Sequence, residues 1–299
     1  MSNKAIKTYS IKELEKLSGI KAHTIRIWEK RYQLVIPKRT PTNIRYYTDK
    51  DLKKILNISS LLKQNYKISQ LSLMSKSELN QALEQFKNGL EWNEKANHYI
   101  HELITISLDF DQYKFDQVST QIIAEKNLEC AFTDIFFPLL ERIGNLWARE
   151  QITVSHEHFL SSNFRKILFS HTKPQTKSFE KKIILFLPQW EEHELSLLLT
   201  HALLSNLDVS PIYLGPKVPL ENLLESIQQV KPSRLISSVT LSNYNEELDT
   251  YLQTLDTLSI PIDLLVSPGY YDQAESIAQK HNVTIHTSKS ALLPKINFV

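Results

Sequence analysis

Hydrophobic residues repeat at helical spacing over roughly the first 170 residues, and short continuous apolar runs follow. Ile11, Leu14 and Leu17 form an apolar stripe that predicts a short first helix. Ser10 is a suitable N-cap for it, because Glu13 follows at the spacing of a capping box. The chain therefore begins with a helix whose start is specified by its own sequence.

Gly19 ends this helix, and a second helix is predicted over residues 22–32. Ile25 and Trp28 face inward from it, which leaves a basic outer face. Two short helices joined by a turn with Gly are typical of a helix-turn-helix, although a helical hairpin with a solvated basic face is the alternative. The next segment, PKRTPTNIRYY at 37–47, favours DNA binding because it is an extended basic arm with aromatic residues.

Helical periodicity continues through the middle of the chain. A helix is predicted from Thr48 to about Lys63, with acidic residues in its first turn. No strand signal occurs between residues 76 and 173. The helices predicted there cover residues 77–88, 93–109, 111–126, 127–149 and 155–170.

From residue 181 the period changes. The run KKIILFLP is typical of a buried parallel strand. The strands predicted in this part cover residues 181–188, 210–214, 234–239, 263–266 and 284–286. The helices between them cover residues 194–206, 220–230, 245–258 and 271–281. Strands that alternate with helices predict a doubly wound α/β domain, flavodoxin-like or Rossmann-like, whose ligand lies beyond the carboxyl ends of the strands.

Charge is distributed unevenly along the 299 residues. Residues 1–75 hold 16 Lys/Arg and 5 Asp/Glu, a balance of +11, whereas the remainder holds 19 and 28, a balance of −9. A basic head on an acidic body is typical of a DNA-binding domain fused to a different module. The predicted fold class is multidomain α and α/β: a winged helix-turn-helix head at 1–75, a helical bundle at 76–177 and a parallel α/β domain at 178–299.

The number of cysteines and the lack of apolar targeting segments in the sequence bear on possible metal sites and on the location of the protein. Cys130 is the single cysteine, which excludes an internal disulfide and argues against paired-thiolate metal sites. No apolar run approaches the length that spans a bilayer, and the first residues lack a signal-peptide core. A cytoplasmic location is expected.

The order TIRIWEKRY, PKRTPTNIRYY and TDKDLKKI resembles the N-terminal winged-helix domain of the MerR family of transcription regulators. The wing lacks the family's usual Gly, and Asn43 is the residue best suited to the positive φ of a tight turn. Base edges or adjacent phosphates are expected to contact His23, Thr24 and Arg26. The DNA backbone is expected to contact Arg31, Tyr32, Arg39, Arg45 and Tyr47.

The segment EEHELS at 191–196 resembles the Asp/Glu–x–His–x–x–Gly motif of cobalamin-binding domains. In that motif the His is the lower axial ligand to cobalt, which implies this role for His193. A carboxylate two residues earlier, here Glu191, would orient the ring. Ser238 and Gly269 stand where such domains use a Ser–x–Leu turn and a Gly–Gly pair against the cofactor's nucleotide tail.

Trp147, followed after nine residues by Glu157 and His158, resembles the helical cap of cobalamin-dependent MerR-type photoreceptor repressors. The resemblance implies that these three residues line the upper face of adenosylcobalamin. The alternatives are a core aromatic residue for Trp147, a buried hydrogen-bonded histidine for His158 and a surface histidine for His193. Light-responsive relatives tend to place a His directly after this Trp; Ala148 stands there instead, so the same capture of cobalt is not expected.

The resulting hypothesis is a DNA-binding transcription regulator, a repressor, whose oligomeric state or DNA affinity is controlled by a cobalamin module. The alternative is the same regulator with a degenerate, cofactor-free α/β domain for dimerisation or partner-protein binding, since Ser196 replaces the motif's Gly. An enzyme is not expected, because no length remains for a substrate barrel and no catalytic loop motif occurs. The expected partners are a double-stranded DNA operator, further copies of the chain as a dimer or tetramer, and RNA polymerase or another protein, but no membrane. Three further histidines are interpreted as surface residues: His156, His171 and His201.

Overall fold

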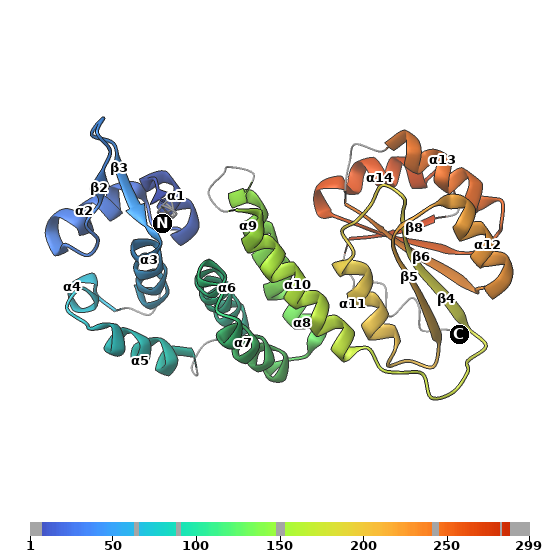
Figure 1. Cartoon of the computed structure of the whole chain (residues 1–299), viewed down its shortest axis with the longest axis horizontal. Helices are drawn as coiled ribbons and strands as arrows, with labels where there is room; N and C mark the ends of the chain where they lie inside the picture. The colour runs from blue at the N-terminus through green and yellow to red at the C-terminus, as the bar shows by residue number, and fades with distance from the viewer. Residues whose placement is uncertain are drawn as a thin grey trace, which may run out of the picture. The chain divides into compact units, whose positions relative to one another are not determined.

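The computed structural model describes residues 8–62, 66–87, 91–147, 153–240, 245–281 and 283–287. The chain divides into two compact units, residues 1–160 and 161–299 (Figure 1). None of the helices within the described ranges is both long and apolar enough to cross a membrane.

Two short helices open the first unit, α1 (Ile11–Ser18) and α2 (Ala22–Tyr32). The predicted capping box is confirmed: the Ser10 hydroxyl accepts from the backbone N–H of Glu13, whose carboxylate accepts from the backbone N–H of Ser10. Gly19 ends α1 in the left-handed conformation, with φ +72°, which an L side chain rarely adopts. Ile25 and Trp28 of α2 are buried, as the pattern predicts.

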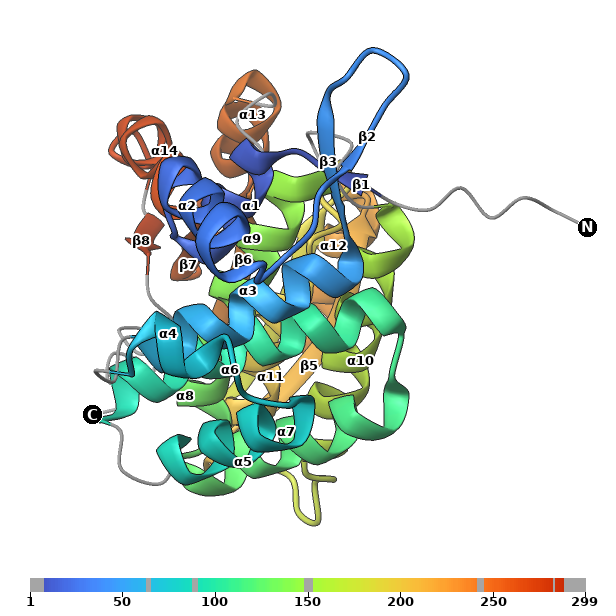
Figure 2. The ribbon, with the colours of Figure 1, turned by 90° about the vertical axis from the view of Figure 1, so that its left-hand side faces the viewer.

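An antiparallel sheet forms the wing, with the order β1 (Thr8–Tyr9), β3 (Arg45–Thr48) and β2 (Lys38–Arg39). The β2–β3 hairpin projects from the head (Figure 2). Asn43 in its turn has φ +65°, so the predicted replacement for the missing Gly is confirmed. The Asn43 side-chain oxygen also accepts a 2.6 Å hydrogen bond from the Arg39 guanidinium, which fixes the bend.

Helices form the described remainder of the first unit: α3 (Asp49–Leu62), α4 (Ile68–Leu71), α5 (Lys76–Lys87), α6 (Trp92–Asp109), α7 (Gln112–Glu125), α8 (Leu128–Ala131), α9 (Phe137–Trp147) and the start of α10 (Val154–His171). The prediction of one α-helix over 127–149 is wrong, because a π-helical turn at Phe132–Phe136 separates α8 from α9. The Phe132 and Phe136 rings are buried and meet edge-on, with centroids 5.0 Å apart. The end of the predicted helix, residues 148–149, lies outside the described residues.

The second unit is the predicted α/β domain. Its strands are β4 (Lys182–Pro188), β5 (Ser210–Val218), β6 (Arg234–Val239), β7 (Ile262–Val266) and β8 (Val283–His286). Its further helices are α11 (Leu195–Leu204), α12 (Leu220–Val230), α13 (Asn245–Asp256) and α14 (Tyr271–Ala278). All strand pairs are parallel and the order is β5–β4–β6–β7–β8, which is the flavodoxin-like one of the two predicted types.

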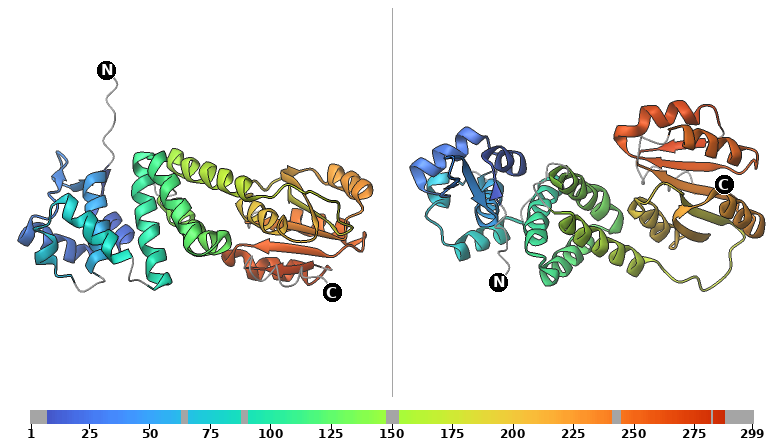
Figure 3. Two further views of the ribbon diagram at one scale, coloured as in Figure 1. Left: turned by 90° about the horizontal axis from the view of Figure 1, so that it is seen from below. Right: turned by 45° about the horizontal axis from the view of Figure 1, so that its top comes forward.

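Helices cover both faces of this sheet (Figure 3). Helix α11 packs on one face, where Leu197 and Leu204 contact a core that includes Ile236 of β6. Helices α12, α13 and α14 cover the opposite face. Because β5 lies on one side of β4 and β6 on the other, the carboxyl ends of β4 and β6 form the topological switch point, where ligands of such sheets bind.

Candidate functional site

Helix α2 presents most of the predicted DNA-contacting side chains. His23, Arg26 and Arg31 are exposed, whereas Thr24 and Tyr32 are half-buried. The Thr24 hydroxyl lies 3.4 Å from the His23 ring, and the Arg31 guanidinium lies 5.7 Å from the centre of the Tyr32 ring. The exposed face of α2 therefore carries hydrogen-bond donors that suit both phosphates and base edges.

The wing adds two exposed guanidinium groups. Arg39 and Arg45 are directly opposite each other in the β2–β3 ladder, so their charges are neighbours. Arg45 also lies 3.7 Å from the carboxylate of Glu29 on α2. A pair of cations on a projecting hairpin suits a DNA backbone, because phosphate contacts fix orientation without reading sequence.

The structure corrects the predicted contact between Tyr47 and DNA. The Tyr47 side chain is fully buried, and its hydroxyl donates a hydrogen bond to the Glu29 carboxylate. Burial first, and then this hydrogen bond, raise the pKa of the Tyr47 hydroxyl well above its usual range. Tyr47 therefore joins the wing to α2, and Glu29, which sequence reasoning overlooked, is its partner. The signal was an isolated acidic residue in a basic helix.

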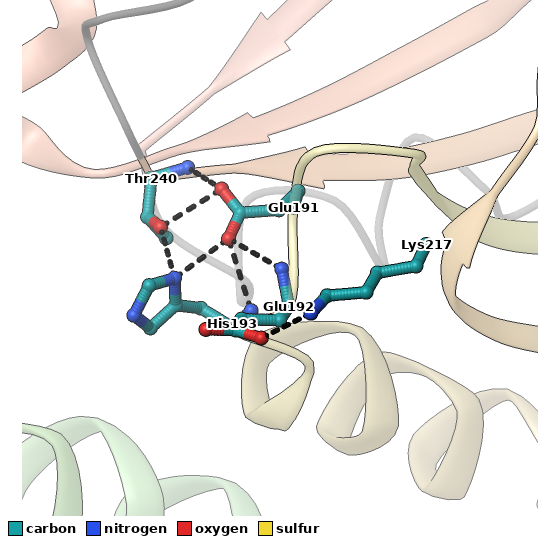
Figure 4. A network of polar contacts seen from close by, with 5 residues as sticks. All are labelled: Glu191, Glu192, His193, Lys217 and Thr240. Carbon is teal, nitrogen blue, oxygen red and sulfur yellow. Dashed lines mark hydrogen bonds and ion pairs between the residues drawn. The ribbon is translucent and has the colours of Figure 1, made fainter.

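A polar network occupies the loop after β4 (Figure 4). Oε1 of the fully buried Glu191 accepts hydrogen bonds from the backbone N–H groups of Glu192, at 3.0 Å, and His193, at 2.9 Å. The same oxygen lies 2.6 Å from Nδ1 of the His193 ring. Oε2 accepts from the backbone N–H of Thr240 at 2.7 Å and from its hydroxyl at 2.9 Å.

These contacts keep Glu191 ionised. Burial raises the pKa of its carboxyl, but the hydrogen bonds from His193 and Thr240 outweigh burial and lower that pKa to about 2. An ionised carboxylate can only accept, so the geometry assigns the proton on His193 to Nδ1. In the neutral form of the ring, Nε2 carries the lone pair; the side chain is 56% exposed, and its far edge points away from Glu191 (Figure 4).

Thr240 completes the network from a neighbouring strand. It is the first residue after β6, so it meets Glu191 at the switch point of the sheet. Sequence reasoning chose Ser238 for the turn after this strand, and that placement is wrong: Ser238 lies inside β6 and is buried. The sequence feature that could have identified Thr240 is its position as the first polar residue after the buried strand β6.

An ion pair holds the loop from the side of β5. The Lys217 ammonium lies 2.6 Å from the Glu192 carboxylate, and its backbone N–H donates to the Glu191 carbonyl at 3.2 Å. Lys217 has φ +57°, an unusual conformation for a non-glycine residue. The hydrogen bond from Lys217 lowers the pKa of the exposed Glu192 carboxyl. The loop that carries His193 is thus fixed from both neighbouring strands.

The side chains of this site suit a cobalt ion held in a macrocycle better than a bare metal ion. Among the described residues, no group of three or more His, Cys, Asp and Glu side chains could hold a bare metal ion. A cobalt ion that is already held by a macrocycle needs only one protein donor, and a neutral imidazole oriented by a carboxylate is a suitable one. His193 with Glu191 fits that requirement.

The remaining residues predicted near the cofactor's tail have different surroundings. Gly269 is exposed, and a Cβ added there would meet no atom within 4 Å. Packing within the described part of the protein therefore does not require a glycine at position 269. Ser196, which replaces the motif's Gly, is half-buried in α11.

The predicted cap residues lie on two helices of the first unit. Trp147 is the last residue of α9, and its side chain lies outside the described part of the chain, as does Ala148. Glu157 and His158 lie near the start of α10, with His158 Nε2 3.7 Å from the Glu157 carboxylate. The His158 side chain is 68% exposed, so the alternative of a buried structural histidine is wrong.

One of the histidines interpreted as surface residues is buried. His156 stacks on the ring of Phe110 at 4.6 Å between centroids, and its Nδ1 lies 2.9 Å from the Thr153 hydroxyl. His201 is half-buried beside the Tyr213 ring, and burial lowers its pKa. Spacing alone did not show these aromatic partners, because each is remote in sequence.

Two segments of the chain match known protein families. Residues 9–78 match the MerR HTH family of regulatory proteins, and residues 99–169 match the B12 binding domain family. The chain is 28% identical over 257 residues to the HTH-type transcriptional repressor CarH of Myxococcus xanthus. The aligned region covers 84% of this chain and 85% of that protein.

Two further similarities are more limited. The HTH-type transcriptional regulator MlrA of Salmonella typhimurium is 28% identical over 100 residues, 33% of this chain and 39% of that protein. A solved cobalamin-binding protein from Desulfitobacterium hafniense overlaps 66% of this chain and 96% of its own, at 12% identity and a TM-score of 0.33. A TM-score that low supports no conclusion about the site.

Proposed function

From the premise that this chain is a MerR-type regulator that carries a B12-binding segment, we propose that a cobalamin bound to it controls its DNA binding. Adenosylcobalamin is the proposed form. The relative that matches 84% of the chain is named a transcriptional repressor, which supports repression as the direction of control. The proposed organisation has the winged head at residues 1–75, the helical cap at 76–177 and the α/β domain at 178–299.

One observation carries the sensory half of the proposal. The buried Glu191 carboxylate holds Nδ1 of His193, which directs the Nε2 lone pair outward at the switch point of the sheet. A bound cobalamin would supply a cobalt centre that accepts a donor from the protein, and Nε2 of His193 would be that donor. Trp147, Glu157 and His158 are the residues of the helical cap that would contact the cofactor.

The head performs the DNA-binding half. Exposed cations on α2 and the wing neutralise phosphates, and the start of α2 reaches the base edges. Helix-turn-helix proteins bind two half-sites as dimers, so we propose an assembly of at least two copies. The proposed DNA contacts are His23, Thr24, Arg26, Arg31, Tyr32, Arg39 and Arg45.

The experiment is a visible absorption spectrum of the purified chain after incubation with adenosylcobalamin in the dark and removal of unbound cofactor. We expect protein-bound absorbance in the wild type and a changed or lost spectrum in His193→Ala. His171→Ala, which alters an exposed histidine, is the matched control and should keep the wild-type spectrum. Equal spectra for His193→Ala and wild type would contradict axial ligation.

The same experiment separates the second candidate function. Ser196 in place of the motif's Gly favours a cofactor-free α/β domain that serves dimerisation or partner binding. In that case the protein stays colourless, its melting temperature is unchanged by adenosylcobalamin, and its affinity for DNA is the same with and without the cofactor.

A further inference from the structure

The first unit contains a cleft of about 550 Å³ between its head and its bundle helices. Its walls come from α1 and the turn that follows, from α3, and from α6 and α9. Helices α3 and α6 pack against each other beside it (Figure 1). The volume is in the range of small-molecule sites. None of the residues assigned above to DNA or cobalamin lines the cleft, so it is a separate site.

The lining of the cleft includes two cations. Lys16 of α1 and Arg142 of α9 line the cleft, as do two polar residues of α6, Asn97 and His101. Among the described residues that line the cleft, none is acidic. The cations are therefore not neutralised by the wall itself, and an anion would find a favourable potential there.

Arg142 has more donors than its surroundings satisfy. Its guanidinium donates a 3.3 Å hydrogen bond to the Asn97 side-chain oxygen, and no carboxylate of the described residues pairs with it. A guanidinium carries five N–H donors and remains charged in proteins. Partial burial lowers the pKa of Arg142, and the charge of Glu141 opposes that shift. A half-buried guanidinium that makes one side-chain hydrogen bond, to a neutral amide, has donors with which to bind a ligand carboxylate.

The lining also has apolar side chains. These are Leu17, Ile20 and Leu62, and the two serines of the cleft are occupied within the protein. The Ser18 hydroxyl donates to the Leu14 carbonyl and the Ser59 hydroxyl donates to the Ser18 carbonyl. A ligand that combines an anionic group with an apolar body would therefore match the side chains of this lining.

We propose that this cleft binds a small organic acid, with the carboxylate on Arg142 and Lys16 and the apolar body against Leu17 and Leu62. The site goes beyond the cobalamin-controlled function and does not depend on it. Since Lys16 precedes the turn into α2 and Arg142 belongs to the bundle, a ligand there connects the DNA-binding head to the bundle helices.

Calorimetric titration of the full chain with benzoate, octanoate and the neutral benzamide tests the proposal. We expect saturable binding of at least one acid and about tenfold or more weaker binding of the amide, because charge-assisted hydrogen bonds are lost. Arg142→Gln and Lys16→Gln should each weaken acid binding several-fold. Lys114→Gln on α7, an exposed cation that does not line the cleft, should leave it unchanged.

Three results would overturn the proposal: no saturable binding of either acid, equal affinity for benzoate and benzamide, or unchanged binding in both cleft variants. Lys16 is exposed, so Lys16→Gln keeps the test valid if Arg142→Gln fails to fold. A readout on the cobalamin spectrum is not needed, so failure here leaves the proposed function standing.

Discussion

The head and the carboxyl edge of the α/β sheet use charge in opposite ways. On α2 and the wing, the guanidinium groups of Arg26, Arg39 and Arg45 are exposed. At the sheet edge, the Glu191 carboxylate is fully buried and accepts hydrogen bonds from residues that follow two different strands. Exposed charge is available to another molecule, whereas buried charge organises the chain around it. This difference predicts which substitutions affect stability and which affect binding.

The largest expected effect is that of Glu191→Ala on stability. The substitution leaves the backbone N–H groups of His193 and Thr240 without their acceptor. Loss of a buried charged partner should lower the free energy of unfolding by roughly 3 kcal/mol or more, measured by urea denaturation. Glu192→Ala removes a neighbouring exposed carboxylate and should have little effect. Similar losses in both variants would contradict the contrast between buried and exposed charge.

Acid should weaken the same network. The folded-state pKa of Glu191, about 2, lies below the ordinary glutamate pKa of 4.5, so its contribution to stability is fully present above pH 4.5 and is lost as pH falls toward 2. The full shift corresponds to roughly 3 kcal/mol. The difference in unfolding free energy between wild type and Glu191→Gln should therefore shrink between pH 5.5 and pH 2.5. A constant difference would show that ionisation of Glu191 does not stabilise the fold.

Most of the fold could be predicted from the sequence because its signals are local. The capping box at Ser10 and Glu13, the turn at Gly19 and the left-handed Asn43 each depend on a few adjacent residues. The alternation of apolar runs and helical patterns likewise predicted all five strands of the parallel sheet. The π-helical turn in the bundle was missed, because the apolar residues in and after it, such as Phe132, Phe136 and Ile143, follow spacings of four and seven that also fit a continuous α-helix.

The sites were predicted less completely because they join remote residues. Glu191 and His193 are two positions apart, and their pairing was foreseen from that spacing. Thr240 reaches Glu191 only because β4 and β6 are neighbours, which depends on strand order. Tyr47 has the residue type of a DNA contact, but its burial depends on how β3 packs, so spacing could not reveal it.

On the exposed side of the comparison, Arg45→Ala should weaken DNA binding without a comparable loss of stability. Removal of one phosphate contact should reduce affinity for operator and unrelated DNA alike and lower the slope of log affinity against log salt by about 1. Fluorescence anisotropy at several salt concentrations measures both quantities. Lys114→Ala, an exposed cation on α7, is the control. Unchanged affinity at every salt concentration would remove Arg45 from the interface.

The smallest effect should come from Tyr47→Phe. This substitution tests the contact between the buried Tyr47 hydroxyl and Glu29, a carboxylate that also lies beside the exposed Arg45. The ring remains buried but its hydrogen bond to Glu29 is lost, so the free energy of unfolding should fall by about 1 kcal/mol. Glu29 would then be held by Arg45 alone among its described partners, and DNA affinity should change only slightly. Tyr46→Phe, at the half-buried neighbouring position, is the matched control for loss of a hydroxyl. A large loss of affinity with unchanged stability would mean that Tyr47 contacts DNA directly, and the wing would have to open for it to do so.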